Sequence, residues 1–274
     1  AVAPEVPNNQ GSLDLLIVTA PEGSILNAQF PVPVAMRHVV GQLLPDVVFG
    51  CLHQFMPHII PAESTCCLWD LPIRGGYSVE AGLGSTKFAT ELVHNGGTGA
   101  RPTKDGLSAT AYPSGVMGSL VEITESVSPL IIWRREFREN SGGVGQYRGG
   151  MGQVLELSSS ENVPLSLFAS LDRIHHPARG REGGGNGAAG LLSLSGGKQL
   201  RAKGEQTIPA GERLLVSTPG GAGFGDPMQR CVNSIKEDVE AGLVSQQNAT
   251  DYHGVIFDHQ GQIDIKATRQ RRGE

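Results

Sequence analysis

The stretch STPGGAGFGDP, residues 217–227, joins an apolar segment expected to be a strand to a segment expected to be a helix. Asp226 and Pro227 favour a helix start, with aspartate as the N-cap and proline at the first helical position. The backbone N–H groups of the preceding glycines could also form an anion-binding nest. We favour the structural role, because a helix start accounts for the order of these residues.

Glycine marks much of the remaining chain, with 38 glycines among 274 residues, about twice the usual share. The glycines follow no collagen-like period and lie beside short segments rich in Val, Ile and Leu, so we expect ordered loops between strands. Such short strands are typical of β-sandwich or barrel-like layers. The expected strands are residues 119–125, 129–137, 152–157, 164–170, 190–195, 206–217 and 254–258.

The residues before this β-rich part predict a strand at 13–19 and a long helix at 34–56. Apolar residues recur every four positions through the helix, and a wide apolar face predicts burial between layers. Gln42 and Asp46 fall largely on another side. Pro45 lies inside the pattern and predicts a kink or a break.

The residues after Pro227 predict a helix that stops at Gly242, and a short helix capped by Ser245. Residues 251–268 then read as a final hairpin. The sequence therefore indicates an α+β fold with β-rich sandwich- or barrel-like layers, Gly-rich loops, a long N-terminal helix and a C-terminal helical segment. We expect three parts, at residues 1–60, 61–226 and 227–274.

The composition excludes several classes of protein. A net charge of −5 gives no reason to bind nucleic acid, and no apolar run approaches the length of a membrane span. The four cysteines make no C-x-x-C pattern and the start lacks the features of a signal peptide, so we expect reduced thiols and a cytoplasmic location. The first residues, rich in Pro and Asn, suggest a chain that begins within a longer protein or after processing.

Residues 91–106 hold the best candidate site, because they gather acids, an imidazole, an amide and a guanidinium around bare backbone. We expect His94 to transfer protons, Glu91 and Asp105 to orient it, and Arg101 to clamp an anion. The same segment supplies two further expected substrate-binding residues, Asn95 and Gly97. The alternative is a rigid glycine-rich turn.

Other motifs carry weaker signals. Residues 185–190 match G-x-G-x-x-G, but a polar loop precedes them and no helix follows, which argues against a dinucleotide site. His53 and His58 straddle a proline and cannot share a helical face. For Asp172, His175 and His176, hydrogen-bonded loop positions are favoured over a metal site.

Five blocks of this sequence, in the right order, resemble the C-terminal half of the hydantoinase B/oxoprolinase family. They are PEGSILNAQFPVPVAMRHVVGQ at 21–42, NGGTGARPTKDG at 95–106, SGGVGQYRGGMGQ at 141–153, TPGGAGFGDP at 218–227, and DVEAGLVSQQNA followed by YHGVIFD. The chain departs from the family at Pro45, at residues 67–85 and at residues 114–125.

The resemblance implies a component of an ATP-dependent hetero-oligomeric complex that hydrolyses a cyclic amide such as a hydantoin, 5-oxoproline or a lactam. An actin-like hydantoinase A-type partner would bind ATP and Mg and phosphorylate the small-molecule substrate. Relatives hold a divalent metal, Zn or Mn, in an N-terminal block of the type NDPYxGGTH. That block is absent here, so no metal ligand is carried over to this chain.

Three alternatives remain open from the sequence. The chain could belong to a ketone carboxylase of the acetone or acetophenone type. It could be a non-catalytic scaffold half of a split subunit, with a separate N-terminal half as a second partner. A stand-alone nucleotide-binding module is the weakest of the three, since no P-loop is present.

Overall fold

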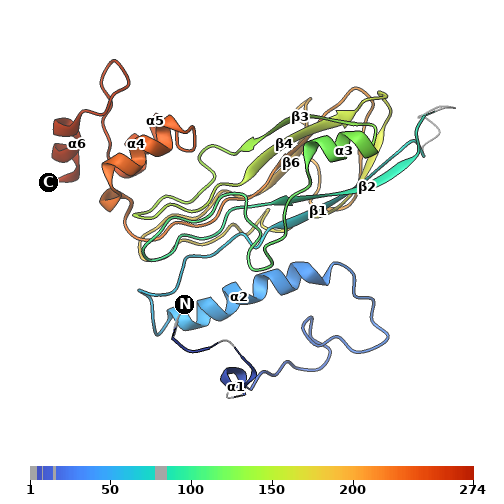
Figure 1. Cartoon of the computed structure of the whole chain (residues 1–274), viewed down its shortest axis with the longest axis horizontal. Coiled ribbons are helices and arrows are strands. Elements are labelled where there is room, and N and C mark those ends of the chain that lie inside the picture. Colours follow the sequence, from blue (N-terminus) through green and yellow to red (C-terminus); the bar gives the residue numbers. More distant parts are fainter. Residues whose placement is uncertain (1–4, 8, 15–16, 78–84) are drawn as a thin grey trace.

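Two antiparallel four-stranded sheets form the body of the protein (Figure 1). The computed structural model describes residues 5–7, 9–14, 17–77 and 85–274. One sheet has the order β2-β1-β5-β7 and the other the order β3-β4-β8-β6. The strands of the first sheet are β1 (Leu68–Gly75), β2 (Phe88–Asn95), β5 (Leu165–Ser170) and β7 (Lys203–Ile208); those of the second are β3 (Leu130–Phe137), β4 (Gln153–Ser159), β6 (Leu191–Leu194) and β8 (Leu214–Ser217).

The hydrophobic core lies between these sheets, which makes the body a β-sandwich. Trp69 and Leu71 of β1 are buried in one cluster with Leu155 and Leu157 of β4. Alternate residues along a strand point to opposite faces, so each strand needs an apolar residue only at every second position. This explains why short segments of mixed polarity suffice to build the sandwich.

The strands expected at 129–137, 152–157, 164–170 and 190–195 correspond to β3, β4, β5 and β6. The expected strand at 206–217 is two strands, β7 and β8, separated by a turn. The β1–β2 hairpin was not expected. Its polar or ring residues Asp70, Pro72 and Arg74 interrupt the apolar pattern in β1.

Two of the strands expected after residue 60 were wrong. Residues 119–125 form most of helix α3 (Val121–Val127). Ile123 and Val127 on that helix are exposed, so their β-branched side chains have no sheet face to pack against. Residues 254–258 contribute only an isolated bridge between Phe257 and Ile263.

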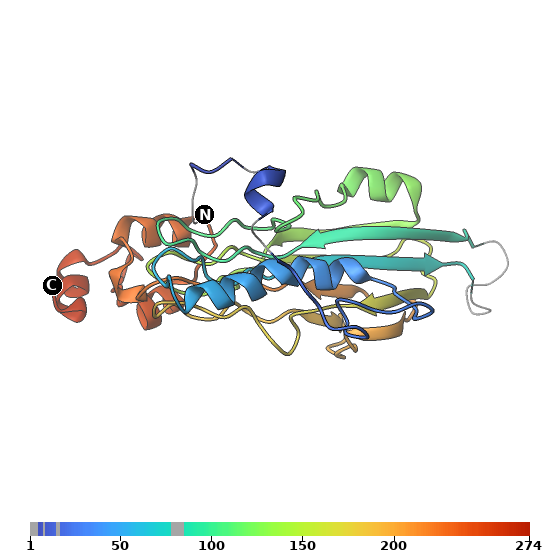
Figure 2. The same cartoon turned by 90° about the horizontal axis from the view of Figure 1, so that it is seen from below.

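The N-terminal part contains α1 (Gln10–Leu13) and α2 (Arg37–His53). The strand expected at 13–19 was wrong where it can be compared: the described residues 17–20 form no strand, and residues 15–16 lie outside the described part. Helix α2 runs without a break through Pro45. It lies along one side of the sandwich (Figures 1 and 2).

The expected burial of the apolar face of α2 was also wrong. Gln42 and Asp46 are the buried residues of the helix, while Val47 and Val48 are exposed. The polar side chains face the body because the body offers them hydrogen-bonding partners: Gln42 donates to Ser114, and Asp46 accepts from Cys66 and Arg173.

The glycine-rich segments extend from the end of the sandwich as extended chains that lie side by side, which Figure 1 shows between the sheets and α4. We call residues 96–100, 141–150, 180–190 and 219–225 the glycine bundle. In its central segment, successive N–H groups donate to different neighbours: Gly220 to Ala188, Gly221 to Gly150, and Ala222 to Glu63. The N–H of Gly223 then donates to Gly185, in the same segment as Ala188. The N–H of Phe224 donates to Tyr147, in the same segment as Gly150.

This rotation of hydrogen bonds has a period of three residues, as in extended threefold helices. Glycine is required because the chains approach too closely for side chains. A Cβ atom on Gly221 would lie 1.8 Å from the carbonyl oxygen of Thr98, and one on Gly220 would lie 1.8 Å from that of Ser141. The expected loops are therefore a packed layer of backbone.

The C-terminal part holds η2 (Pro227–Gln229), α4 (Val232–Glu240), α5 (Gln246–His253) and α6 (Ile265–Arg272). The stop at Gly242, which has a positive φ of 69°, and the cap by Ser245 are confirmed. The hairpin expected at 251–268 is reduced to one antiparallel bridge between Phe257 and Ile263 around Gly261, because α5 extends to His253 and α6, capped by Asp264, follows. Across the described ranges, no helix is both long and apolar enough to cross a membrane.

Candidate functional site

The six residues expected to form a site do not surround one cavity. Glu91 lies exposed on β2, whereas His94 is 2% exposed and lies beside the sandwich core. Burial, with a smaller contribution from the charge of Arg135, lowers the pKa of His94 to about 4. The neighbouring Asn95 is also buried, and its amide donates to the carbonyl oxygen of Val116.

The other three residues lie in or beside the glycine bundle. Gly97 donates its N–H to the carbonyl oxygen of Pro219. Arg101 is exposed and donates to the backbone oxygen of Asp105 at 2.7 Å. The Asp105 carboxylate accepts two hydrogen bonds from Arg230, each 2.8 Å long. The roles assigned to all six residues stay predictions.

The structure gives two glycine-rich motifs, residues 185–190 and 220–225, packing roles. Residues 185–190 lead into strand β6 rather than a helix, so they lack the helix N-terminus that a dinucleotide site uses. In residues 220–225 the N–H groups already donate to carbonyl oxygens, which leaves none for an anion. Asp226 caps η2 by accepting from the N–H of Met228, which confirms its N-cap role, but the expected helix is divided into the short η2 and α4, which begins at Val232.

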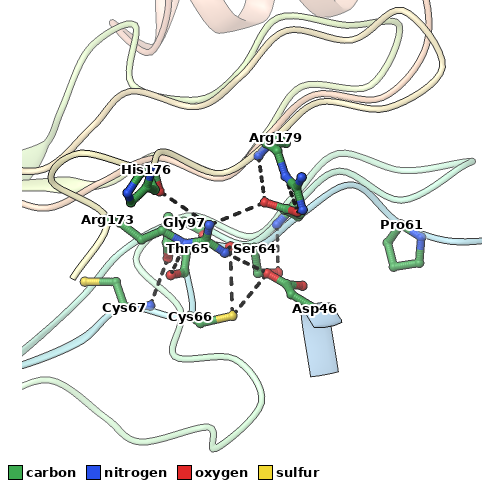
Figure 3. Close-up of polar contacts among 12 residues, drawn as sticks. Asp46, Pro61, Ser64, Thr65, Cys66, Cys67, Gly97, Arg173, His176 and Arg179 are labelled. Carbon is green, nitrogen blue, oxygen red and sulfur yellow. Dashed lines mark hydrogen bonds and ion pairs between the residues drawn. The ribbon is translucent and has the colours of Figure 1, made fainter. Parts of the chain in front are cut away.

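A different group of polar residues gathers beneath α2, and Figure 3 shows it. Its first member is Asp46, which is 6% exposed. Its Oδ2 atom accepts from the Sγ of Cys66 at 3.2 Å and from Nη2 of Arg173 at 3.1 Å. Burial outweighs both contacts and raises the pKa of Asp46 to about 6. This carboxyl group therefore changes its charge close to neutral pH.

Arg173 holds the group together from the loop after β5. Its Nη1 lies 3.3 Å from the Oε2 atom of Glu63, while its Nε and Nη2 donate to the carbonyl oxygens of Thr65 and Ser64. A planar guanidinium with several donors in fixed directions suits such a multiple contact. The guanidinium thereby joins α2, residues 63–65 and its own loop.

Glu63 is the second buried acid, at 3% exposed. It accepts from the N–H and side chain of Arg179, with an ion-pair distance of 2.5 Å. Burial alone would raise its pKa, but the hydrogen bonds from Arg179 and the charge of Arg173 lower it instead. Two neighbouring acids thus have pKa values shifted in opposite directions, which is a feature of proton-transfer sites.

Cys66 donates to Asp46 as a neutral thiol. Burial and the charge of Asp46 raise the pKa of Cys66 far above its usual value, which excludes a thiolate nucleophile at neutral pH. Both Cys66 and Arg173 have a φ of 53°, a left-handed conformation uncommon outside glycine. Such backbone is found at functional sites, where surrounding contacts hold it.

A cavity of about 480 Å³ opens onto this group. Its wall includes Asp46, Glu63 and Arg173, together with His175 and His176 from the same loop and Val47 of α2. A second cavity, of about 800 Å³, adjoins it and shares Leu43, Arg173 and both histidines. We define the candidate site as Asp46, Glu63, Cys66 and Arg173 with the first cavity.

Asp172, for which a hydrogen-bonded loop position was favoured over a metal site, accepts from the indole N–H of Trp69 at 2.6 Å. His53 and His58 do come together, each 3.3 Å from one oxygen of Glu182. Within the described ranges, no group of three His, Cys, Asp or Glu residues is arranged to hold a metal ion.

Sequence reasoning missed the candidate site because its members are far apart, at positions 46, 63, 66 and 173. Asp46 stood out only as a polar residue of a helix. Its position directly after Pro45, in an otherwise apolar stretch, was the one available signal.

A β-sandwich extended by a glycine bundle, with a buried acidic group beneath a flanking helix, is the architecture of this chain. The profile of the Hydantoinase B/oxoprolinase family matches residues 1–227, and the chain belongs to that family. The chain is 30% identical to caprolactamase subunit beta from Pseudomonas jessenii, over 97% of this chain and 48% of that subunit.

Two solved structures share the fold. The ATP-dependent caprolactamase from P. jessenii superposes with a TM-score of 0.78 and 26% identity, over 94% of this chain and 46% of that chain. A nucleotide-free acetone carboxylase superposes with a TM-score of 0.62 and 23% identity, over 78% of this chain and 33% of that chain. This likeness shows the fold alone. The chain spans about half the length of three curated relatives that it matches.

Proposed function

We propose that this chain forms part of a B-type subunit in an ATP-dependent complex that hydrolyses a cyclic amide. The observation that carries this proposal is the match to caprolactamase subunit beta along 97% of the chain, supported by the common fold. A hydantoinase A-type, actin-like subunit would bind ATP and Mg. The complex would be cytoplasmic, in keeping with four cysteines that are all free.

The overall reaction consumes two water molecules, one added across the ring amide and one used in the conversion of ATP to ADP and phosphate. The C–N bond breaks, the water oxygen joins the carbonyl carbon, and the ring nitrogen gains a proton, while ATP is converted to ADP and phosphate. In place of the site at residues 91–106, we propose Asp46 as the group that takes the proton from water and returns it to nitrogen. Its pKa of about 6 suits this transfer near neutral pH.

Arg173 and Cys66 are positioning residues in this proposal. Arg173 fixes one carboxylate oxygen of Asp46, and the thiol of Cys66 donates to the same oxygen. The family's divalent metal, Zn or Mn, would be held by the part of the subunit outside this chain. The described residues offer no cluster that fits it, so we assign no step to a metal here.

The test uses the assembled complex with ATP and ε-caprolactam, 5-oxoproline or hydantoin, and measures the ring-opened amino acid. We expect product that depends on ATP and on this chain. Asp46→Asn should lower kcat by roughly 10²–10⁴-fold and remove the acidic limb of the rate profile near pH 6. Asp251→Asn, a matched change at an exposed aspartate, should leave the rate unchanged.

Ketone carboxylation is the competing outcome. If the complex instead consumes acetone, bicarbonate and ATP and leaves all three cyclic amides intact, the proposed hydrolase function is wrong. If hydrolysis occurs and Asp46→Asn retains the full rate and pH profile, the function stands and the role of Asp46 is wrong.

A further inference from the structure

The two buried residues of helix α2 are polar, while several of its large apolar residues are exposed to solvent. Gln42 and Asp46 are 4% and 6% exposed. Further contacts to the body come from both ends of the helix, His38 to Asp70 at 3.1 Å and His53 to Glu182 at 3.3 Å. A surface helix ordinarily shows the opposite arrangement, with its apolar stripe facing the core.

The outward side of α2 and the turn after it are therefore unusually apolar. Val47 and Val48 are 60% and 54% exposed, and Phe55 is 81% exposed. Leu44 and Ile59 are also exposed. Other apolar residues of the helix, Val39, Leu43 and Leu52, are half-buried, so the exposed apolar residues are those on its outward side.

The segment before α2 has the same character. Ile17, Val18 and Phe30 are 91%, 89% and 98% exposed. The hydrogen bonds found for residues 17–35 stay within that segment, as in the pairs Gly23 N–H to Asn27 O and Val32 N–H to Gln29 O. It loops away from the sandwich beside α2 (Figures 1 and 2).

We call these two regions together the apolar surface. It comprises Ile17, Val18, Ile25, Leu26, Phe30, Val32 and Val34 of the segment, and Leu44, Val47, Val48, Phe55 and Ile59 of α2 and the following turn. Soluble proteins rarely leave so many large apolar side chains exposed in one stretch of chain, and such patches mark interaction surfaces.

We propose that the apolar surface binds the other half of a hydantoinase B-type subunit. This inference deepens the proposed function by naming what completes the site. The chain covers 48% of caprolactamase subunit beta and 46% of the solved caprolactamase chain, and the part of such a subunit that this chain does not match is the occupant we assign to the apolar surface. The apolar surface lies in one block, at residues 17–59, whereas the core of the sandwich is closed between its two sheets.

Docking at this surface also covers the candidate site. Val47 belongs both to the apolar surface and to the wall of the cavity that holds Asp46. A polypeptide seated on Val47 therefore closes the mouth of that cavity. Residues of the other half would then face Asp46, and the site is complete only when the two halves are together.

Photo-crosslinking tests the identity of the bound polypeptide. p-Benzoylphenylalanine replaces Phe30 or Val48 in the full chain, in cells that also make the other half and the ATP-binding subunit. We expect crosslinked peptides from the other half, whether it is a separate chain or a continuation of this one. The matched control places the probe at Phe168, a 54% exposed aromatic residue on β5, and should give no such crosslink.

Crosslinks from positions 30 and 48 only to a second copy of this chain, or only to the ATP-binding subunit, would overturn the proposal. Absence of crosslinks would overturn it too. A second measurement uses Phe30→Asp with Val48→Asp, which should weaken binding of the other half at least tenfold while the melting temperature of this chain alone stays unchanged. Phe168→Asp should leave binding intact. Both readouts report association, so they stand apart from any failure of the hydrolase assay.

Discussion

Gly97 and Gly150 approach each other so closely that a Cβ atom on Gly97 would lie 1.8 Å from the carbonyl oxygen of Gly150. A hydrogen bond holds the two segments at this distance: Gly150 donates its N–H to the carbonyl oxygen of Thr98 at 2.9 Å. Gly97 therefore has a packing role in the glycine bundle, and this role does not depend on the substrate binding expected of it.

Replacing Gly97 by alanine should destabilise the protein by roughly 3 kcal/mol or more, since a backbone oxygen cannot move aside as a flexible side chain would. Urea unfolding measures this. Gly41→Ala is the control: nothing lies within 4 Å of a Cβ there, and it sits inside α2. That change should stabilise by up to about 1 kcal/mol. Equal effects of the two changes would contradict the close packing of the bundle.

Arg230 joins the glycine bundle to the C-terminal helices, and its side chain is 3% exposed. It contacts Asp105 at 2.8 Å and Asp238 of α4 at 2.7 Å, while Asp238 also pairs with Arg148. Arg230→Met leaves two acids without this partner and should cost about 3–5 kcal/mol of unfolding free energy. Adding Asp105→Asn should recover part of that loss. If the losses of unfolding free energy from Arg230→Met and Asp105→Asn simply add in the double variant, Arg230 and Asp105 are not coupled.

His94 makes stability depend on pH. Its pKa is about 4 in the folded protein against an ordinary value of 6.5, so the unfolded chain binds more protons between these values. The stabilising contribution is present above pH 6.5 and is lost as the pH falls toward 4, a change of about 3 kcal/mol.

Comparison with His94→Gln isolates this contribution, because Asp46 acts in the opposite direction. The raised pKa of Asp46 makes its contribution largest at low pH and removes it as the pH rises through about 6. The variant should show a smaller fall in unfolding free energy than the parent between pH 6.5 and 4. Parallel pH profiles would place His94 in solvent.

The four cysteines should differ in reactivity. Cys51 and Cys231 are exposed, and Cys66 and Cys67 are buried. Hydrogen bonds from the backbone of Ser234 and Asn233 lower the pKa of Cys231, whereas burial raises that of Cys67. Iodoacetamide at pH 7.5 should therefore alkylate Cys231 first and Cys51 second, followed by peptide mass spectrometry.

In the same experiment, Cys66 and Cys67 should react only after unfolding. The variant Cys231→Ser should lose the fastest phase. Early labelling of Cys66 in the folded protein would contradict the buried contact with Asp46.

Several features could be predicted because they depend on neighbouring residues alone. The N-cap at Asp226, the cap at Ser245 and the stop at Gly242 each follow from a short local pattern. Four strands followed from apolar composition between glycine-rich stretches. The family, too, could be identified from blocks of sequence in order.

Other features depend on residues that are distant in the chain. The polar side of α2 is buried because Arg173 lies 127 positions after Asp46 and supplies its partner. The hairpin β1–β2 forms because Trp69 and Leu71 have a second sheet to pack against, despite Pro72 between the strand's ends. Neither the partner of Asp46 nor the second sheet behind β1 can be predicted from neighbouring residues.

The sequence by itself determined that glycine-rich stretches lie between short apolar strands, and that the chain belongs to one family. Only the tertiary structure decided that 217–227 is the centre of a packed backbone layer and not an anion-binding loop. The physical reason is that each N–H group at 220–225 finds its acceptor on another segment, and no local pattern specifies which carbonyl oxygen that is.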